Sequence, residues 1–320
     1  MKPAVKHIFW FLTGAFLLII AFLFISRLPA RQFSWEDQNS SESPGRLESI
    51  SDFFKNLFKP SEINILVLGR PGNGYQGENL ADTLILAHFN PDKEKVFLIS
   101  LPRDLWVADN QEQYKLNEII HKKKLPQALE KIKEITGLKP DGYLIIDLKM
   151  VQEIIDFLGG VEIVLDEPAV DWVTNFVMKA GPQHLSGEDA VWLIRNRYNP
   201  QGDFFREKNQ QKIIKSAFEK FLSLDNNRKE EFFKKFILNP SFLANAQLDV
   251  SSISPYLFNS SLIEKVSLES IVLDFSTKLF KTQEIPLPSS ATTTYISALV
   301  PSAGFENYSQ VRKYLQERLK

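Results

Sequence analysis

Residues 81–107 read ADTLILAHFNPDKEKVFLISLPRDLWV, and this stretch decides the fold. Two apolar runs, residues 83–89 and 96–101, flank the polar segment 90–95. Each run has the length of a strand that is buried in a sheet. The short polar segment between them predicts an antiparallel hairpin.

Outward from this hairpin, strand-like and helix-like patterns alternate along the chain. Further strands are predicted at residues 63–68, 143–148, 161–165 and 295–300. Helices are predicted at residues 125–136 and 151–158, from Ser186, from Asp203 to about Leu222, from Tyr308, and as several short segments within 223–320. This order predicts the α/β class, with a mixed central β-sheet sandwiched by helices.

The composition excludes several kinds of partner and catalytic site but does not identify a function. The 320 residues include 38 Lys+Arg and 39 Asp+Glu, for a formal net charge of −1, so no nucleic-acid partner is expected. The absence of Cys from the sequence excludes a disulfide scaffold, thiolate catalysis and iron–sulfur ligation. Since 44% of the residues are hydrophobic, the chain is expected to fold rather than remain disordered.

The first 61 residues predict an anchor and a linker. Residues 8–25 read IFWFLTGAFLLIIAFLFI without a charge, and as a helix they span roughly 27 Å, which is close to the thickness of a bilayer. A cleaved signal peptide is the alternative, but its apolar region is usually about 7–15 residues long. The expected segments are a cytoplasmic tail (1–7), a single-pass transmembrane helix (8–25), a linker with a short amphipathic helix (26–61) and an extracytoplasmic domain (62–320).

Charged residues flank the strands of the predicted hairpin. Asp82 stands just before one strand, and Arg103 and Asp104 follow the other. Asp82 alone is typical of a turn or a cap, and an Arg-Asp pair is often a surface ion pair of little energetic value. However, sheet proteins bind ligands at strand ends, so these three residues are candidates for a site.

Two further clusters lie at helix ends. Arg195 and Arg197 are two residues apart, so they share a face only if the helix ends by Arg195. Arg206 and Gln210 share a face of the next helix, which Asp203 is placed to cap. The ordinary alternatives are a basic pair that complements the helix dipole and an amphipathic helix.

Together the four arginines suggest a clamp for a diphosphate, because each guanidinium can bind phosphate oxygens in a bidentate way. Asp82 beside such a clamp suggests a divalent metal, since magnesium binds one or two carboxylates together with water and substrate phosphates. This combination favours metal-assisted phosphoryl transfer. The glycine-rich stretch 69–74 (GRPGNG) lacks the pattern of a nucleotide-binding loop.

Seven stretches, in this order behind one N-terminal anchor, resemble the LytR-CpsA-Psr family: INILVLG, ADTLILAHFNPDKEKVFLISLPRDLWV, YKLN, GYLIIDL, LGGVEIVL, AGPQHLSGEDAVWLIRNRY and GDFFREKNQQ. The resemblance divides the domain into a motif-bearing core (62–222) and a more variable C-terminal portion (223–320). It implies a membrane-anchored bacterial enzyme of cell-wall assembly. Such an enzyme transfers a glycopolymer from a polyprenyl-diphosphate carrier to peptidoglycan and forms a phosphodiester.

The resemblance also implies roles for individual residues. The residues that would bind the diphosphate are Arg103, Arg195, Arg197, Arg206 and Gln210. Asp82 would help to hold Mg²⁺, and Asp82, Arg103 and Asp104 would be catalytic, Asp104 by orienting an arginine or activating the acceptor. The lipid tail of the carrier is expected in an apolar tunnel between the sheet and the helices.

Three positions depart from the family's pattern. Residues 69–71 read GRP where the family usually has a G-S-D run, so one metal carboxylate is absent; Arg70 offers a charge at the same strand end, and Asn73, Glu78 or Asn79 a substitute ligand. The stretches LADT and NQQ each lack an arginine that is common in the family. These departures motivate one alternative, a non-catalytic, membrane-tethered binder of wall glycolipids. A further alternative is a polyprenyl-diphosphate hydrolase, with water as the acceptor.

Overall fold

A computed structural model describes residues 62–109, 112–122, 124–196, 198, 203–237, 245–248, 266–287 and 294–320. The predicted tail, transmembrane helix and linker at residues 1–61 lie outside the described residues, and so does Arg197. Among the described residues, no helix is both long and apolar enough to cross a bilayer.

The central sheet has six strands in the order β11-β6-β1-β2-β3-β12. The strands are β1 (Ile63–Arg70), β2 (Thr83–Asn90), β3 (Lys95–Ser100), β6 (Gly142–Asp147), β11 (Ala246–Leu248) and β12 (Ser267–Val272). The predicted hairpin is confirmed, because β2 pairs antiparallel with β3, with Leu86 opposite Ile99. β1 pairs antiparallel with β2 but parallel with β6, and β3 pairs parallel with β12, so the sheet is mixed as predicted.

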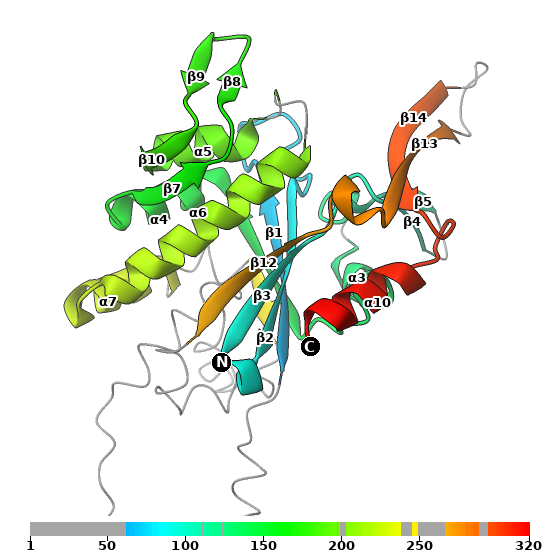
Figure 1. Ribbon diagram of the computed structural model, residues 1–320, viewed down its shortest axis with the longest axis horizontal. Helices are drawn as coiled ribbons and strands as arrows, with labels where there is room; N and C mark the ends of the chain where they lie inside the picture. Colours follow the sequence, from blue (N-terminus) through cyan, green and yellow to red (C-terminus); the bar gives the residue numbers. More distant parts are fainter. Residues whose placement is uncertain are drawn as a thin grey trace, which may run out of the picture.

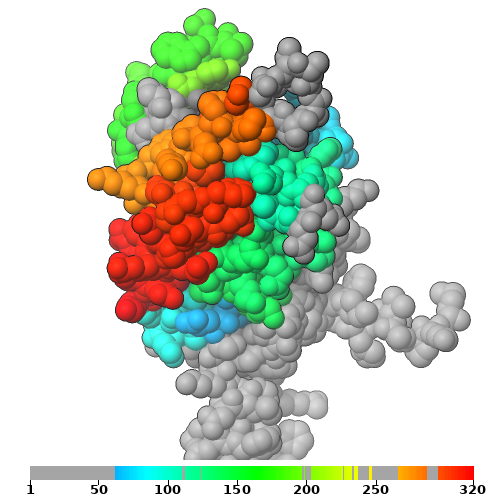
Figure 2. All heavy atoms as spheres, turned by 90° about the vertical axis from the view of Figure 1, so that its right-hand side faces the viewer, coloured from blue at the N-terminus to red at the C-terminus, as the bar shows by residue number. Residues whose placement is uncertain are grey.

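The sheet is covered on both faces because its strands are apolar on both sides. Successive residues of β1, such as Ile65 and Leu66, point to opposite faces and belong to two different buried clusters. One face packs against α4 (Leu148–Phe157), α5 (Gly187–Arg195) and α6 (Asp203–Ser223). The other face packs against α3 (Leu125–Thr136) and α10 (Ser309–Arg318), which lie side by side in Figure 1. Figure 2 shows the red C-terminal segment covering this second side.

Several helix ends follow directly from local sequence. α3 carries Pro126 in its first turn and ends at Gly137, whose positive φ of 79° suits glycine. α5 begins with a capping box in which Ser186 and Asp189 bond each other's backbone. α6 begins at Asp203 and runs to Ser223, close to the predicted range.

The C-terminal portion contributes strands that local patterns did not reveal. β12 extends the central sheet beside β3, although the two strands are far apart in sequence. β13 (Phe280–Leu287) pairs with β14 (Thr294–Pro301), of which only β14 was predicted. Smaller ladders join β4 (Trp106–Ala108) to β5 (Gln113–Lys115), β7 (Val161–Leu165) to β10 (Gly181–Leu185), and β8 (Ala169–Asp171) to β9 (Phe176–Met178).

The remaining short helices are α7 (Asn226–Phe232), the π-helical turn η4 (Phe233–Ile237) and the 3₁₀ turns η2 (Pro91–Lys93), η3 (Leu116–Glu118) and η6 (Phe275–Thr277). Of these, η3 and η6 border the site described below. η3 lies between β5 and α3, and η6 lies between β12 and β13.

Gly187 tests the packing of α5 on α4. Its N–H donates to Asp156 Oδ1 at 2.7 Å, and a Cβ at this position would lie 2.4 Å from the carbonyl oxygen of Gln152. We therefore expect Gly187→Ala to lower the free energy of unfolding by about 1–3 kcal/mol, measured by denaturant titration. Glu188→Ala, at the exposed neighbour, is the control and should cost at most about 1 kcal/mol; an equal loss in both variants would contradict the proposed clash.

Candidate functional site

The candidate site lies at one end of the central sheet. Asp82 immediately precedes β2, whereas Arg103 follows β3 and Asp147 ends β6. Because β2 runs antiparallel to β1 and β3, its start lies at the same end as their last residues. The topology thus brings together side chains from segments that are distant in sequence, at an end where sheet proteins often bind ligands.

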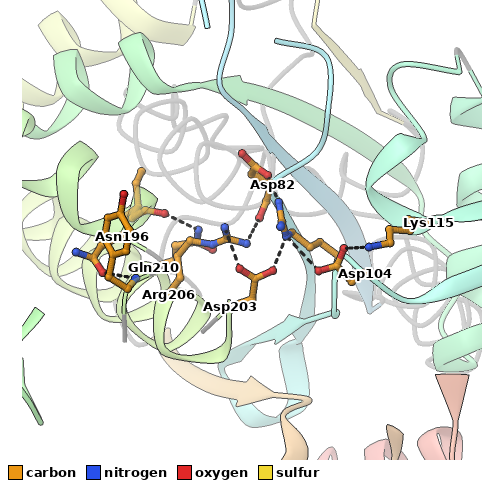
Figure 3. Close-up of polar contacts among 10 residues, drawn as sticks. Asp82, Asp104, Lys115, Asn196, Asp203, Arg206 and Gln210 are labelled. Carbon is orange, nitrogen blue, oxygen red and sulfur yellow. Dashed lines mark hydrogen bonds and ion pairs between the residues drawn. The ribbon is translucent and has the colours of Figure 1, made fainter. Parts of the chain in front are cut away.

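Arg103 is the centre of an ion-pair network. Its Nη1 bonds Asp82 Oδ1, and its Nε lies 2.5 Å from Asp203 Oδ2 and 3.6 Å from Asp104 Oδ2. Figure 3 shows these contacts converging between Asp82, Asp203 and Asp104. Burial alone would lower the pKa of Arg103, but the surrounding carboxylates outweigh burial and raise it. The guanidinium is therefore charged at every physiological pH.

Arg206 is the second cation of the network, and it is almost completely buried, with 1% of its surface exposed. Its Nη2 donates to the backbone oxygen of Asp82 at 3.1 Å, and its Nη1 lies 3.2 Å from Asp203 Oδ1. A buried charge is tolerated only when it is paired and hydrogen-bonded. Asp203 meets this requirement by binding both arginines.

Asp203 is a site residue that the sequence analysis did not assign to the site. It was expected only as a helix cap, yet it links Arg103 to Arg206. A signal was present in the sequence, because Asp203 and Arg206 are three residues apart at a helix start and so lie on one face.

The β5–η3 segment forms hydrogen bonds with the two loops that carry the site residues. The backbone N–H of Asn117 donates to the Arg103 oxygen at 3.0 Å, and the Asn117 oxygen accepts from Ala81 N–H at 2.8 Å. Lys115, in the same segment, places its Nζ 2.9 Å from Asp104 Oδ1. The YKLN stretch therefore holds the backbone on both sides of the network and orients Asp104.

A cavity of about 580 Å³ lies between the sheet and the helices. We call it the lipid-side cavity because it has the aliphatic lining that is expected around a lipid tail. Its aliphatic lining consists of Val67, Ile85, Ile146, Leu148, Val151, Ile194, Ile213 and Ile214. The polar groups at its wall include Asp82, Arg195, Arg206 and Gln210. It combines an aliphatic lining with clustered cations, as an amphiphilic anion requires.

Four predicted residues thus reach this cavity. Arg195 ends α5, and Asn196 is extended, so the helix stops where the spacing of the two arginines required. The Arg195 guanidinium lies 4.8 Å from the centre of the Tyr75 ring, a cation–π contact at the cavity wall. Gln210 donates to Ile194 O at 3.3 Å, and its buried Oε1 has no hydrogen-bond partner among the described residues.

The glycine-rich loop lacks the metal carboxylate that is usual in the family, and the structure shows where two of its possible substitutes, Arg70 and Asn79, lie. Arg70 also lines the lipid-side cavity, and its Nη1 donates to Asn79 Oδ1 at 3.0 Å. Asn79 thus contacts Arg70, and the described residues contain no group of three or more His, Cys, Asp or Glu side chains that could hold a metal. Asp147 supplies a further carboxylate at the cavity wall. It is the last residue of β6.

Glu207 is a buried acid next to the network. Burial raises its pKa to about 8, although the nearby charge of Arg206 opposes this rise. Its Oε2 is buried without a hydrogen-bond partner among the described residues. Glu207 therefore carries a proton at neutral pH and can donate a hydrogen bond.

Comparisons with known proteins show the family to which the chain belongs. The pattern of the family described as "LytR_cpsA_psr family" matches residues 32–283, and the chain belongs to this family. It is 25% identical over 226 residues (69% of this chain, 73% of the relative) to the polyisoprenyl-teichoic acid–peptidoglycan teichoic acid transferase TagU of Enterococcus faecalis. It is also 25% identical over 275 residues (82% of this chain, 66% of the relative) to the transferase TagV of Bacillus subtilis, which carries the same description.

The fold is shared with solved structures. The crystal structure of B. subtilis TagV superimposes with a TM-score of 0.57 and 22% identity, covering 82% of this chain and 98% of the other. This agreement confirms the α/β class with a mixed central sheet and flanking helices.

Glu207 gives a testable dependence of stability on pH. The folded chain keeps the Glu207 proton up to about pH 8, whereas the ordinary carboxyl loses it near 4.5. The folded state thus holds the extra proton between these values, and the free energy of unfolding falls as pH rises through the window.

Glu207→Gln should flatten this part of the pH profile, measured as the thermal midpoint at several pH values. Glu219→Gln, at an exposed position of the same helix, is the matched control and should keep the original slope. An unchanged slope in Glu207→Gln would refute a raised pKa.

Proposed function

We propose that this chain is a membrane-anchored transferase of cell-wall assembly that moves a glycopolymer, with one phosphate, from a polyprenyl diphosphate to a hydroxyl of peptidoglycan. The observation that carries the proposal is the lipid-side cavity, whose lining combines aliphatic side chains with Arg195, Arg206 and Gln210. Its family relatives are named for a transfer of this kind.

The cavity suits the two parts of such a donor. An isoprenoid chain is stabilised by aliphatic side chains, because burial of apolar surface contributes about 25 cal/mol per Å². A diphosphate is stabilised by guanidinium groups that form charge-assisted hydrogen bonds. Since Arg206 is buried in the protein, its attraction for phosphate is screened less than that of a surface arginine.

The transfer itself needs one bond to form and one to break. The acceptor hydroxyl oxygen bonds to the phosphorus that carries the glycan, and the bond from this phosphorus to the bridging oxygen breaks. Polyprenyl phosphate leaves with the bridging oxygen, and the hydroxyl proton passes to a carboxylate, Asp104 or Asp82. The guanidinium groups of Arg103 and Arg206 stabilise the charge that grows on the leaving phosphate.

Mg²⁺ is proposed as a partner of the bound donor. Asp82 is 28% exposed and lies at the cavity wall, so its carboxylate can serve as a single protein ligand. Magnesium is often bound by one or two carboxylates together with substrate phosphates and water. When bound in this way, the ion would neutralise phosphate charge.

A location at the cell membrane, with the domain outside, is also proposed. The uncharged run at residues 8–25 supports it. A second support is the tip of the β8–β9 hairpin (Figure 1), where Trp172, Val173, Phe176 and Val177 are each at least 45% exposed. Tryptophan and other apolar side chains at a protruding tip suit the interface between membrane and water.

The first test uses the clamp. We expect Arg195→Ala to weaken binding of a polyprenyl-diphosphate glycan by about 10- to 100-fold, because a charge-assisted hydrogen bond contributes about 1.5–3 kcal/mol. Binding is measured by titration calorimetry with the full chain in detergent. Arg318→Ala, an exposed arginine of α10, is the matched control and should bind as the unaltered protein does; equal affinities in all three proteins would contradict the clamp.

The second test addresses the metal. We expect Mg²⁺ to bind measurably only when the donor is present, and Asp82→Asn to abolish this donor-dependent binding, measured by calorimetry. Chelation should also lower turnover of the unaltered protein. Mg²⁺ binding that is the same with and without donor, or that persists in Asp82→Asn, would contradict the assignment of Asp82.

A further inference from the structure

A second cavity, of about 450 Å³, adjoins the ion-pair network and is not explained by the donor. Arg103, Asp104 and Asp203 line it, whereas Asp82 and Arg206 line the lipid-side cavity. These five residues are joined by the contacts already described. The network therefore forms a partition between the two cavities.

Helix α6 contributes to both cavities from two neighbouring rows of side chains. Arg206 and Gln210, four residues apart, line the lipid-side cavity. Asp203 and Glu207, also four residues apart, line the second cavity. Because residues at this spacing share a helix face, Arg206 with Gln210 and Asp203 with Glu207 form two adjacent rows on α6, one row toward each cavity.

The lining of the second cavity differs from that of the first. Its polar side chains include Asp104, Lys115 and Glu207 together with the hydroxyls of Thr282 and Ser297. Its apolar lining contains none of the isoleucine and valine side chains that line the first cavity and suit an isoprenoid. Clustered carboxyl, ammonium and hydroxyl groups suit instead a ligand that carries many hydroxyls.

Phe275 gives this cavity an aromatic wall. Its side chain is 51% exposed, and its ring packs edge-to-face on Phe204, with the ring centres 4.7 Å apart. Asp274 caps η6, which carries Phe275, and the Lys208 Nζ lies 2.9 Å from Asp274 Oδ2. The exposed ring is thus held in place, as a stacking platform for a sugar requires.

Glu207 supplies an independent sign of a ligand. Its side chain is buried and lines the second cavity, and its Oε2 has no hydrogen-bond partner among the described residues. An unsatisfied buried polar atom is costly, and a ligand oxygen in the cavity would satisfy it.

We propose that the second cavity binds the acceptor, as a pyranose ring of a peptidoglycan strand stacked on Phe275, so that its hydroxyl meets the donor phosphate at the partition. The inference rests on the proposed function and deepens it. Donor and acceptor then enter from opposite sides of the network of Asp82, Arg103 and Asp203. Asp104 lines the second cavity and contacts Lys115. Its carboxylate can therefore accept the proton of the acceptor hydroxyl.

The test combines two variants with a matched control. Phe275→Ala removes the platform, and Ser297→Trp fills the cavity from an exposed position of β14. Phe305→Ala is the control, because Phe305 is similarly exposed, at 45%, but lines neither cavity. The full chain in detergent is titrated with soluble glycan strands from peptidoglycan, by NMR, and separately with the polyprenyl-diphosphate donor.

We expect Phe275→Ala to weaken glycan binding and to raise the KM for glycan by about tenfold, and Ser297→Trp to abolish glycan binding. Donor affinity should stay within about twofold in both variants, and Phe305→Ala should behave as the unaltered protein does. Glycan binding that is unchanged in both variants would overturn the inference even if the donor is transferred. Glycan binding that depends on Phe275, in a protein that never consumes donor, would uphold this cavity as a saccharide site and refute the transferase.

Discussion

The structure depends on one arrangement, the Arg103 guanidinium held among the carboxylates of Asp82, Asp104 and Asp203. Arg206, buried behind it, shares Asp203 as a partner. Each charge taken out of water would cost several kcal/mol if it were unpaired, so the five groups must be placed together or not at all. This requirement ties the loop before β2, the end of β3 and the start of α6 to one point.

The pairing of strands in the mixed sheet places these segments at the same end of the sheet. An antiparallel β2 between β1 and β3 returns the chain to the same end of the sheet. The backbone of Asn117 then fixes the two loops on which Asp82 and Arg103 lie. The network borders one cavity with isoleucine and valine in its lining and another with carboxyl, ammonium and hydroxyl groups beside Phe275. This difference in lining fits a reaction between a lipid-linked donor and a sugar acceptor.

The central hairpin and several helix ends could be predicted from local sequence. The hairpin followed from two apolar runs around a polar turn, and the ends of α3 and α5 followed from proline, glycine and a capping box. Local patterns did not reveal β12, because its pairing with β3 joins segments more than 160 residues apart. The partners of Arg103 were missed in part for the same reason, since Asp203 lies 100 residues away in sequence. Glu207 resembled an ordinary helix residue until packing showed that it is buried.

The most direct test of the account is the chemical identity of the product. The full chain is incubated with a polyprenyl-diphosphate glycan, Mg²⁺ and peptidoglycan, and the phosphorus of the glycan is followed by ³¹P NMR. The account predicts a phosphodiester that joins the glycan to peptidoglycan, together with polyprenyl phosphate. A glycan that ends in a phosphate monoester, or a donor that stays intact while it is tightly bound, would contradict the account and favour a hydrolase or a binding protein.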